Sequence, residues 1–288
     1  MKWYAKNKRM LALLPAVLFI GLIVVYGLLM SFLESISGAY GWTIEHYLGI
    51  FKEERFVDSL SYSLYIAGIS TLASLIIGLV VTKLIYHYLK NVESRMLVWI
   101  PMLFPHFVWG YMMVLLFSQT GWFSSLLLAG GLIQESSDFP ILITDEKGIG
   151  IILTYIWKEV PFVVLLLLPV YLNMPKQLPM VVKTLGGNSW NVFRTVEWPW
   201  VFPVIVEAGI IVFAFVFSAF ELPYLLGTTY PQMVPVLAYE WFYQGDWSKR
   251  PLAYVAMILI TLIILMLALA ASALMNKKRY YLSRGSSE

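Results

Sequence analysis

The sequence predicts an all-α integral membrane protein with six transmembrane helices. Hydrophobic residues make up 60% of its 288 residues, charged residues only 13%, and the mean hydropathy is +0.76. A soluble domain contains about a quarter charged residues, so most of this chain must face lipid or other helices. Six apolar runs approach the roughly 20 residues that a helix needs to cross the hydrocarbon core. We therefore expect one membrane domain over residues 1–288 and no soluble domain.

The first three apolar runs contain no charged residue. They are Leu11–Met30, Ser59–Thr82 and Met96–Phe117. Pro101 and Pro105 are expected to kink the third helix, which a membrane tolerates when neighbouring groups satisfy the freed carbonyls. The first run is longer than the apolar core of a typical signal peptide, and no clear cleavage site follows it, so we expect it to be retained as a span.

Two of the last three runs carry charge and proline, as helices inside a bundle do. The three runs are residues 149–172, 200–220 and 252–274. Lys158 and Glu159 lie within the fourth run and Glu207 within the fifth, whereas the sixth is uncharged. We expect the fourth and fifth helices to pack against other helices, because a charged side chain facing lipid is costly.

The distribution of lysine and arginine predicts that both termini are cytoplasmic. In that orientation the cytoplasmic side holds Lys2, Lys6, Lys8, Arg9, Lys83, Lys90, Arg95, Lys176, Lys183, Arg194, Lys277, Lys278, Arg279 and Arg284, and the other side holds Lys52, Arg55, Lys147, Lys249 and Arg250. An even number of spans agrees with this orientation. The external segments are then 31–58, 118–148 and 221–250, which either form a docking face or are solvated loops.

The polar segment from Pro175 to Pro203, between the fourth and fifth runs, has an apolar pattern of its own. Its first part predicts a short amphipathic helix, because apolar residues recur at helical spacing. These residues are Leu178, Val181, Val182 and Leu185. Gly186 and Gly187 then end the helix, since glycine accepts the left-handed cap conformation.

A second short helix is expected after the glycine pair. Asn188 or Ser189 can cap it, and its apolar residues are Trp190, Val192, Phe193 and Val196. Pro199 and Pro203 mark the return to the bilayer. An interfacial helix that anchors the bundle to lipid headgroups also explains the amphipathic pattern, but it does not explain the glycine turn.

At these residues the chain resembles the permease subunits of type I, binding-protein-dependent ABC importers. Gly186, Val196 and Pro199 have the spacing of that family's cytoplasmic loop, and the run Lys183-Thr184-Leu185-Gly186 resembles its Arg-Thr-Leu-Gly version. Phe193-Arg194 matches its frequent Phe-Arg pair. The resemblance covers nearly the whole chain, from residues 44–64 (IEHYLGIFKEERFVDSLSYSL) to residues 220–227 (FELPYLLG).

Two departures from the family pattern lie in the same loop. Met180, Val181 and Val182 stand where the family has Glu-Ala-Ala, and Trp198 stands where it usually has leucine before the proline. The resemblance therefore implies docking by shape rather than by an acidic contact. One hypothesis is a heterodimer with a second permease that keeps the acidic residue, and a homodimer is the alternative.

The resemblance implies a type I importer permease fold in a bacterial or archaeal plasma membrane. It also implies a cytoplasmic ATPase dimer, a second permease subunit and an external solute-binding protein as partners. The loop 175–199, here named the coupling loop, would contact the ATPase through Val181, Val182, Lys183, Thr184, Leu185, Gly186, Gly187, Ser189, Trp190, Phe193 and Pro199. The sequence contains no Gly-rich phosphate loop, so we expect a transport subunit and not an ATPase or other enzyme. No cofactor and no nucleic-acid partner is expected.

Ionisable residues inside spans are candidates for the translocation pathway, because each costs about 2.5–3.5 kcal/mol to insert. The candidates are Lys158, Glu159, Glu207, Glu221 and Tyr224. Lys158 and Glu159 are adjacent and point in different directions, so each needs its own partner, and structural pairing is the alternative interpretation. Glu221 with its aromatic neighbours suits a cationic solute, or is simply solvated at a span end.

Metal and thiol chemistry find no support in the sequence. Cysteine is absent, and His46, His87 and His106 have no metal-ligand spacing. We expect His106, next to Pro105, to be a packed and hydrogen-bonded histidine.

Two other classes of function stand beside the importer. A secondary transporter or channel independent of ATP is the main alternative, although no repeated half is visible, and a membrane enzyme would need clustered catalytic residues. The loop and the FELPYLLG run (residues 220–227) look most like the polyamine, thiamine, ferric-iron and phosphonate branch of the family. We therefore expect a polyamine-like or other small solute.

Overall fold

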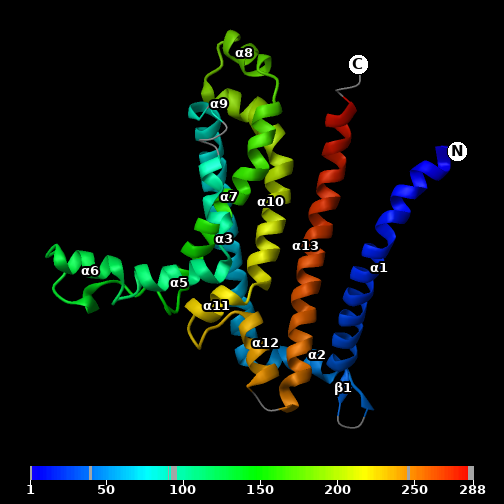
Figure 1. Ribbon diagram of the computed structural model, residues 1–288, viewed down its shortest axis with the longest axis vertical. Helices are drawn as coiled ribbons and strands as arrows, with labels where there is room; N and C mark the ends of the chain where they lie inside the picture. The colour runs from blue at the N-terminus through cyan, green and yellow to red at the C-terminus, as the bar shows by residue number, and fades with distance from the viewer. Residues whose placement is uncertain (1, 39–40, 90, 92–95, 245–246, 285–288) are drawn as a thin grey trace. The chain divides into compact units, whose positions relative to one another are not determined.

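A computed structural model describes residues 2–38, 41–89, 91, 96–244 and 247–284 (Figure 1). Among these residues, six helices are long and apolar enough to cross a membrane. They are Leu13–Ser35, Glu54–Tyr88, His106–Ala129, Ile149–Asn173, Ser189–Ser218 and Trp247–Ala273. The prediction of an all-α membrane protein with six spans is confirmed.

The chain forms two compact units. The first contains Met1–Val57 and Leu237–Thr261, and the second contains Asp58–Val236 and Leu262–Glu288. Helices α3 (Glu54–Tyr88), α12 (Val234–Tyr243) and α13 (Arg250–Arg284) each have residues in both units.

The first unit begins with the long helix α1 (Lys2–Ser35), whose described side chains are mostly exposed. A two-residue antiparallel pair follows, β1 (Ser37–Gly38) with β2 (Gly41–Trp42), then α2 (Glu45–Gly49) and the 3-10 turn η1 (Ile50–Lys52). The 3-10 turn η5 (Trp247–Lys249) precedes α13. The guanidinium of Arg55 binds both carboxylate oxygens of Glu240 at 3.0 Å, a geometry that fixes orientation as well as charge.

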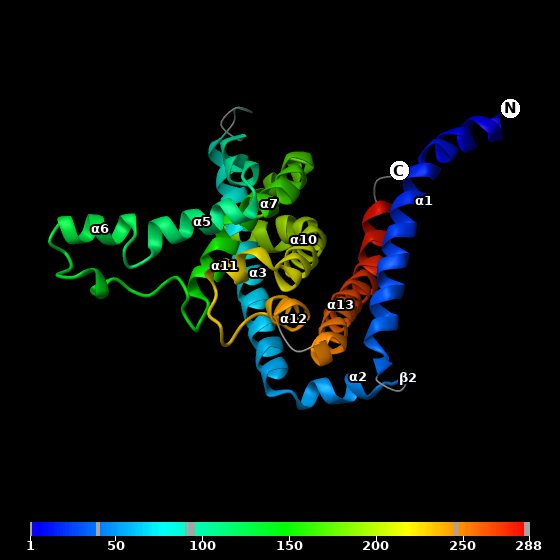
Figure 2. The same ribbon diagram turned by 60° about the horizontal axis from the view of Figure 1, so that its bottom comes forward.

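The second unit is built on α3, α7 (Ile149–Asn173) and α10 (Trp198–Ser218), which run side by side in Figures 1 and 2. Helix α7 is the most buried of the six spans. It approaches α3 closely at Gly78, where a Cβ atom would lie 2.5 Å from Cγ1 of Val163. The small residue permits this contact, as is common between membrane helices.

The third apolar run differs from its prediction. Instead of one kinked helix, a 3-10 helix η2 (Leu97–Leu103) is followed by a separate helix α5 (His106–Phe117). Phe104 is extended, with φ −97° and ψ 138°, because a residue before proline avoids the helical region. Helix α6 (Trp122–Ala129) continues beyond α5, so part of the expected external segment 118–148 is helical.

Helices α5 and α6 extend away from the three packed helices as an arm in both views (Figures 1 and 2). The 3-10 turn η3 (Ser136–Asp138) lies between α6 and α7, and α11 (Glu221–Leu226) follows α10. Helix α5 packs on α11, where a Cβ atom at Gly110 would lie 2.8 Å from side-chain atoms of Leu222 and Leu225. The base of the arm is thereby fixed to the helices around α7.

Candidate functional site

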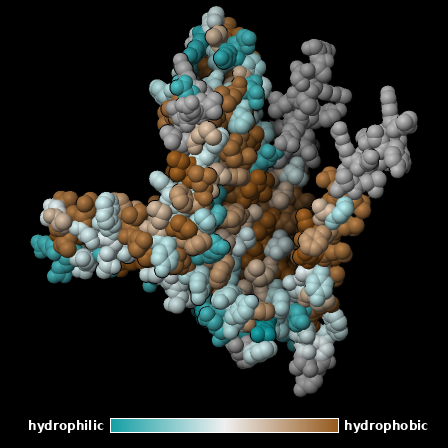
Figure 3. All heavy atoms as spheres, viewed as in Figure 1, coloured by the Kyte–Doolittle hydropathy of each residue, from teal (hydrophilic) through white to brown (hydrophobic). Residues whose placement is uncertain are grey.

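The coupling loop forms a helix, a sharp turn and a second helix. Helix α8 (Gln177–Thr184) and helix α9 (Ser189–Val192) are joined by residues 185–188, and the π-helical turn η4 (Phe193–Glu197) leads into α10. Figure 1 shows α8 and α9 at one end of the helices α7 and α10. Hydrophilic side chains gather over that end in Figure 3, whereas hydrophobic atoms cover much of the middle of the same unit.

Two glycines give the turn its shape. Gly186 has φ +84°, a conformation that costs other residues energy. Its N–H donates to the carbonyl of Lys183 at 3.0 Å, and the N–H of Gly187 donates to the carbonyl of Val182 at 2.9 Å. This pair of hydrogen bonds is the Schellman motif that closes a helix end. The predicted glycine turn is therefore present.

Gly187 is required because there is no room for a side chain, and not because of its φ angle. A Cβ atom at Gly187 would lie 2.6 Å from Cγ1 and 2.8 Å from the carbonyl oxygen of Val182. Of the two candidate caps, Asn188 is the one used, because its Oδ1 accepts a hydrogen bond from the N–H of Asn191 at 2.9 Å. The turn thus holds α8 against α9 by contacts within the loop itself.

The residues predicted to contact an ATPase divide into exposed and inward-facing groups. Leu185 is 82% exposed, and Met180, Val181 and Trp190 are exposed as well. Gly187 and Phe193 are half-buried, as is Val182. The other predicted contact residues, Lys183, Thr184, Gly186, Ser189 and Pro199, are exposed. The loop therefore presents an apolar surface around Leu185.

An ion pair that sequence reasoning missed anchors the loop to α3. Glu197 is buried, and its Oε2 lies 2.9 Å from Nζ of Lys83 and accepts a hydrogen bond from Tyr171 at 3.3 Å. The same ammonium lies 5.1 Å from the ring centre of Phe193. A glutamate directly before an apolar run was the available signal, since such a carboxylate needs a cation when it is buried.

The second candidate site lies within the helices, where Lys158 and Glu159 are only 6% and 7% exposed. The ammonium of Lys158 donates to the carbonyls of Phe104 and Pro101. The carbonyl of Phe104 lies at the break between η2 and α5, where Lys158 satisfies it, whereas the carbonyl of Pro101, inside η2, also accepts a hydrogen bond from Nε1 of Trp109 at 2.8 Å. Lys158 therefore has backbone partners of its own, and its structural pairing stays a prediction.

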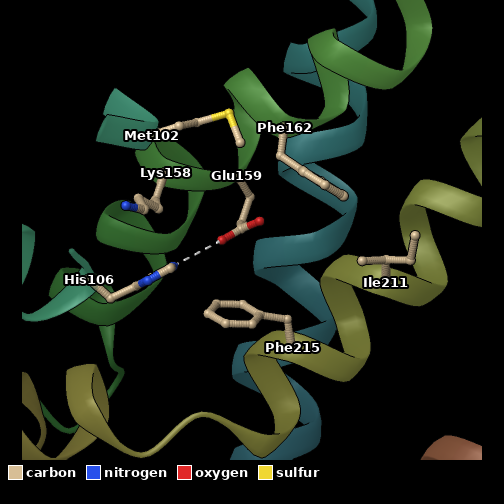
Figure 4. Close-up of a pocket in the computed structure, with 7 residues that line it drawn as sticks. All are labelled: Met102, His106, Lys158, Glu159, Phe162, Ile211 and Phe215. Carbon is tan, nitrogen blue, oxygen red and sulfur yellow. Dashed lines mark ion pairs between the residues drawn. The ribbon is translucent and has the colours of Figure 1, made fainter. Parts of the chain in front are cut away.

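Glu159 points the other way, toward His106 (Figure 4). Its Oε1 lies 3.8 Å from Nε2 of His106, whose ring packs 4.7 Å from that of Phe215. These residues line a cavity of about 230 Å³, named here the glutamate cavity, together with Met102, Lys158, Phe162 and Ile211. His106 packs as expected, but its contact with Glu159 is longer than the expected hydrogen bond, and it faces a cavity that the sequence did not predict.

Glu221 lines a neighbouring cavity of about 380 Å³ with Tyr155 and Phe220, and His106 and Phe215 line both cavities. His106 thus lines one cavity together with Glu159 and the other together with Glu221. Tyr224 is exposed and stacks on Phe220 at 5.0 Å, and Glu207 is half-buried on α10. Neither of these two candidates lines the two cavities. In the part of the chain that the structure describes, no cluster of His, Asp or Glu could hold a metal ion.

Several described permease proteins have sequences similar to this chain. The chain is 26% identical over 237 residues to the inner membrane ABC transporter permease protein YnjC of Escherichia coli, covering 81% of this chain and 43% of YnjC. It is 24% identical to the thiamine transport system permease protein ThiP of E. coli, covering 64% of this chain and 33% of ThiP. The probable sulfate transport system permease protein cysT of Chlorella vulgaris is 26% identical, and the match covers 73% of this chain and 75% of cysT. The chain thus spans less than half the length of YnjC and ThiP.

Solved structures share the fold. A bacterial alginate ABC transporter in complex with a pentasaccharide-bound periplasmic protein aligns with a TM-score of 0.77 and 20% identity, covering 96% of both chains. The MetNI methionine ABC transporter, in inward-facing conformations, aligns with a TM-score of 0.55 and 17% identity, covering 77% of this chain and 95% of that one. The predicted type I importer permease fold is confirmed.

The family model for the inner membrane component of binding-protein-dependent transport systems matches residues 75–279. This range is most of the chain, and it contains the coupling loop and both cavities. Its members are transport components, in agreement with the expectation of a transport subunit that is not an enzyme. The chain belongs to the family of binding-protein-dependent transport system inner membrane components.

Proposed function

We propose that this chain is the permease subunit of an ATP-driven importer and forms half of its translocation pathway. The exposed apolar surface around Leu185 supports this proposal best. A surface loop that only joins two spans has no reason to expose leucine and tryptophan on a turn fixed by two glycines. Family membership agrees with it.

The coupling loop transmits force because its central turn is closed by hydrogen bonds and its C-terminal end is anchored to α3. The Schellman turn fixes α8 to α9, and the Lys83–Glu197 ion pair fixes the loop to α3. Closure of two ATPase subunits on bound ATP would push the loop, and the push would reach the helices that line the cavities. ATP hydrolysis would then reverse the movement.

The proposed complex contains an ATPase dimer, an external solute-binding protein and a second permease. Both termini and the coupling loop lie on the cytoplasmic side of a bacterial or archaeal plasma membrane, an orientation that rests on the distribution of lysine and arginine. A heterodimer is favoured because Met180, Val181 and Val182 offer no acidic residue where the family has one. Two copies of this chain and no other permease in the purified complex would refute the heterodimer.

The proposed solute is a small cation of polyamine-like charge. The glutamate cavity and its neighbour each present a carboxylate, from Glu159 and Glu221, beside the aromatic ring of Phe215. The ammonium of Lys158 donates to backbone carbonyls and not to Glu159, but it keeps its positive charge, so Lys158, Glu159 and Glu221 together give the two cavities one net negative charge. A carboxylate beside an aromatic face binds cations by charge and by cation–π attraction.

The test is purification of the tagged chain from native membranes in mild detergent. Mass spectrometry of the accompanying proteins is expected to find an ATP-binding subunit and a solute-binding protein, and the small molecule released from the latter identifies the solute. Uptake into proteoliposomes is expected to require ATP and the ATP-binding subunit. Solute flux through the chain without ATP would instead support a channel or secondary transporter.

A further inference from the structure

A basic cavity of about 340 Å³ lies where the coupling loop meets the ends of α3 and α7. Lys83 and His87 line it from α3, and Lys176 and Lys183 line it from the coupling loop. We name it the basic pocket. Leu185 and Trp190 of the exposed apolar surface do not line it, whereas Met180 borders both.

The described residues do not balance the charge in this pocket. Among the lining residues that the structure describes, Glu197 is the only carboxylate, and it is paired with Lys83. Lys176 and Lys183 are exposed and have no ion-pair partner among the residues that the structure describes. Three lysines against one glutamate leave two uncompensated positive charges among the described lining residues. The ring of His87 is held by a hydrogen bond of 2.9 Å from Nδ1 to the carbonyl of Lys83, which fixes its place in the wall.

The remaining lining residues are of the types found where a helix leaves the membrane. The span of α3 ends at Tyr88 and that of α7 at Asn173, so the pocket lies at the level where the spans leave the bilayer. Tyr86 and Tyr171 line it with their rings 5.5 Å apart. Tyrosine is enriched at this level because its ring is apolar and its hydroxyl is polar. Met174 and Met180 add apolar wall.

We propose that the basic pocket binds the headgroup phosphate of an anionic phospholipid. The ammonium groups of Lys176 and Lys183 would each donate to phosphate oxygens, and the apolar wall would accept the start of the acyl chains. Basic pockets between transmembrane helices at this depth suit anionic headgroups. One bound lipid would contact α3, α7 and α8 together, and would hold the coupling loop against the helices.

The test measures lysine acetylation of the full chain, purified with its accompanying partners and placed in nanodiscs. Discs of phosphatidylcholine alone are compared with discs that contain phosphatidylglycerol, using a water-soluble amine-reactive ester and mass spectrometry. Acetylation of Lys176 and Lys183 is expected to fall about fivefold in the anionic discs, the effect of one lysine–lipid contact at the membrane surface. Lys52 and Lys147, exposed outside the pocket, serve as internal controls and are expected to change much less.

Variants separate a site from general surface charge. Lys176→Gln with Lys183→Gln is expected to lower the affinity for phosphatidylglycerol about thirtyfold in native mass spectrometry. The control Lys52→Gln with Lys147→Gln removes the same charge and is expected to leave this affinity unchanged. Equal binding by both variants would overturn the proposal.

Two further outcomes would also overturn it. In the first, millimolar inorganic phosphate protects Lys176 and Lys183 in phosphatidylcholine discs to the same extent as the anionic lipid. That result would assign the pocket to a soluble anion. Protection that depends on the ATPase subunit and not on the lipid would assign it to an acidic protein surface.

Discussion

Replacement of Gly186 by alanine tests whether the coupling loop transmits force as a rigid turn. Gly186 has φ +84°, and a Cβ atom added to it would meet no other atom within 4 Å, so alanine adds backbone strain without a clash. A residue other than glycine in this conformation costs about 1–2 kcal/mol, which lowers the population of the closed turn about 5- to 30-fold relative to open forms. The variant isolates the turn from its surface, because it leaves Leu185 and Trp190 in place.

Solute transported per ATP hydrolysed, measured in proteoliposomes that contain the whole complex, is the decisive quantity. We expect this ratio to fall severalfold in Gly186→Ala while ATP hydrolysis continues, and to fall further in Gly186→Asp, where a larger side chain and a charge are added. Gly131→Ala is the matched control, because Gly131 has φ +70° and open space around it but lies in the segment between α6 and α7. An unchanged ratio in Gly186→Ala, or an equal loss in Gly131→Ala, would refute the argument.

Three further predictions test the remaining contacts by substitution. Leu185→Asp is expected to weaken association with the ATPase about 30-fold or more, as loss of an interface anchor does, without changing the melting temperature of the isolated chain. Lys83→Met is expected to lower stability by about 1–3 kcal/mol by leaving the Glu197 carboxylate with only Tyr171, and Lys83→Met with Glu197→Gln is expected to recover part of the loss in a thermal melt. Glu159→Gln is expected to slow uptake of a cationic solute about tenfold or more, since a charge-assisted contact contributes about 1.5–3 kcal/mol, whereas Glu207→Gln is expected to slow it less. Equal effects of the two glutamate variants would contradict the pathway assignment.

Local chemistry made the coupling loop predictable from the sequence. The apolar spacing over 178–185 and the glycine pair specify a helix end that nearby hydrogen bonds complete. No distant residue is needed to form the Schellman turn. The same holds for the spans, whose lengths follow from the thickness of the bilayer.

Contacts between distant segments were not predictable in the same way. Glu197 and Lys83 lie 114 positions apart, and only the packing of α3 beside α10 brings them to 2.9 Å. His106 became a cavity residue because Pro105 ends η2 and starts α5, which turns that histidine toward Glu159. The sequence indicated a kink at these prolines, but the complete break depends on Lys158 satisfying the carbonyl of Phe104.

The residues in the candidate pathway show the same limit. Polarity and depth indicate Lys158, Glu159, Glu207, Glu221 and Tyr224 as candidates. In the structure, Lys158 donates hydrogen bonds to backbone carbonyls, whereas Glu159 and Glu221 line two cavities that share His106 and Phe215. Polarity identifies which side chains need partners, whereas the fold decides which of them face a cavity.

Site-specific cross-linking from Leu185 tests the central claim most directly. The natural chain contains no cysteine, so Leu185→Cys carries a single thiol to which a photoactivatable maleimide can be attached. In native membranes we predict a covalent adduct between this position and an ATP-binding subunit, identified by mass spectrometry, and none from the equally substituted Leu132, an exposed residue beyond α6. An adduct pattern in which Leu185 never reaches an ATP-binding subunit, or reaches it no more often than Leu132 does, would contradict the account.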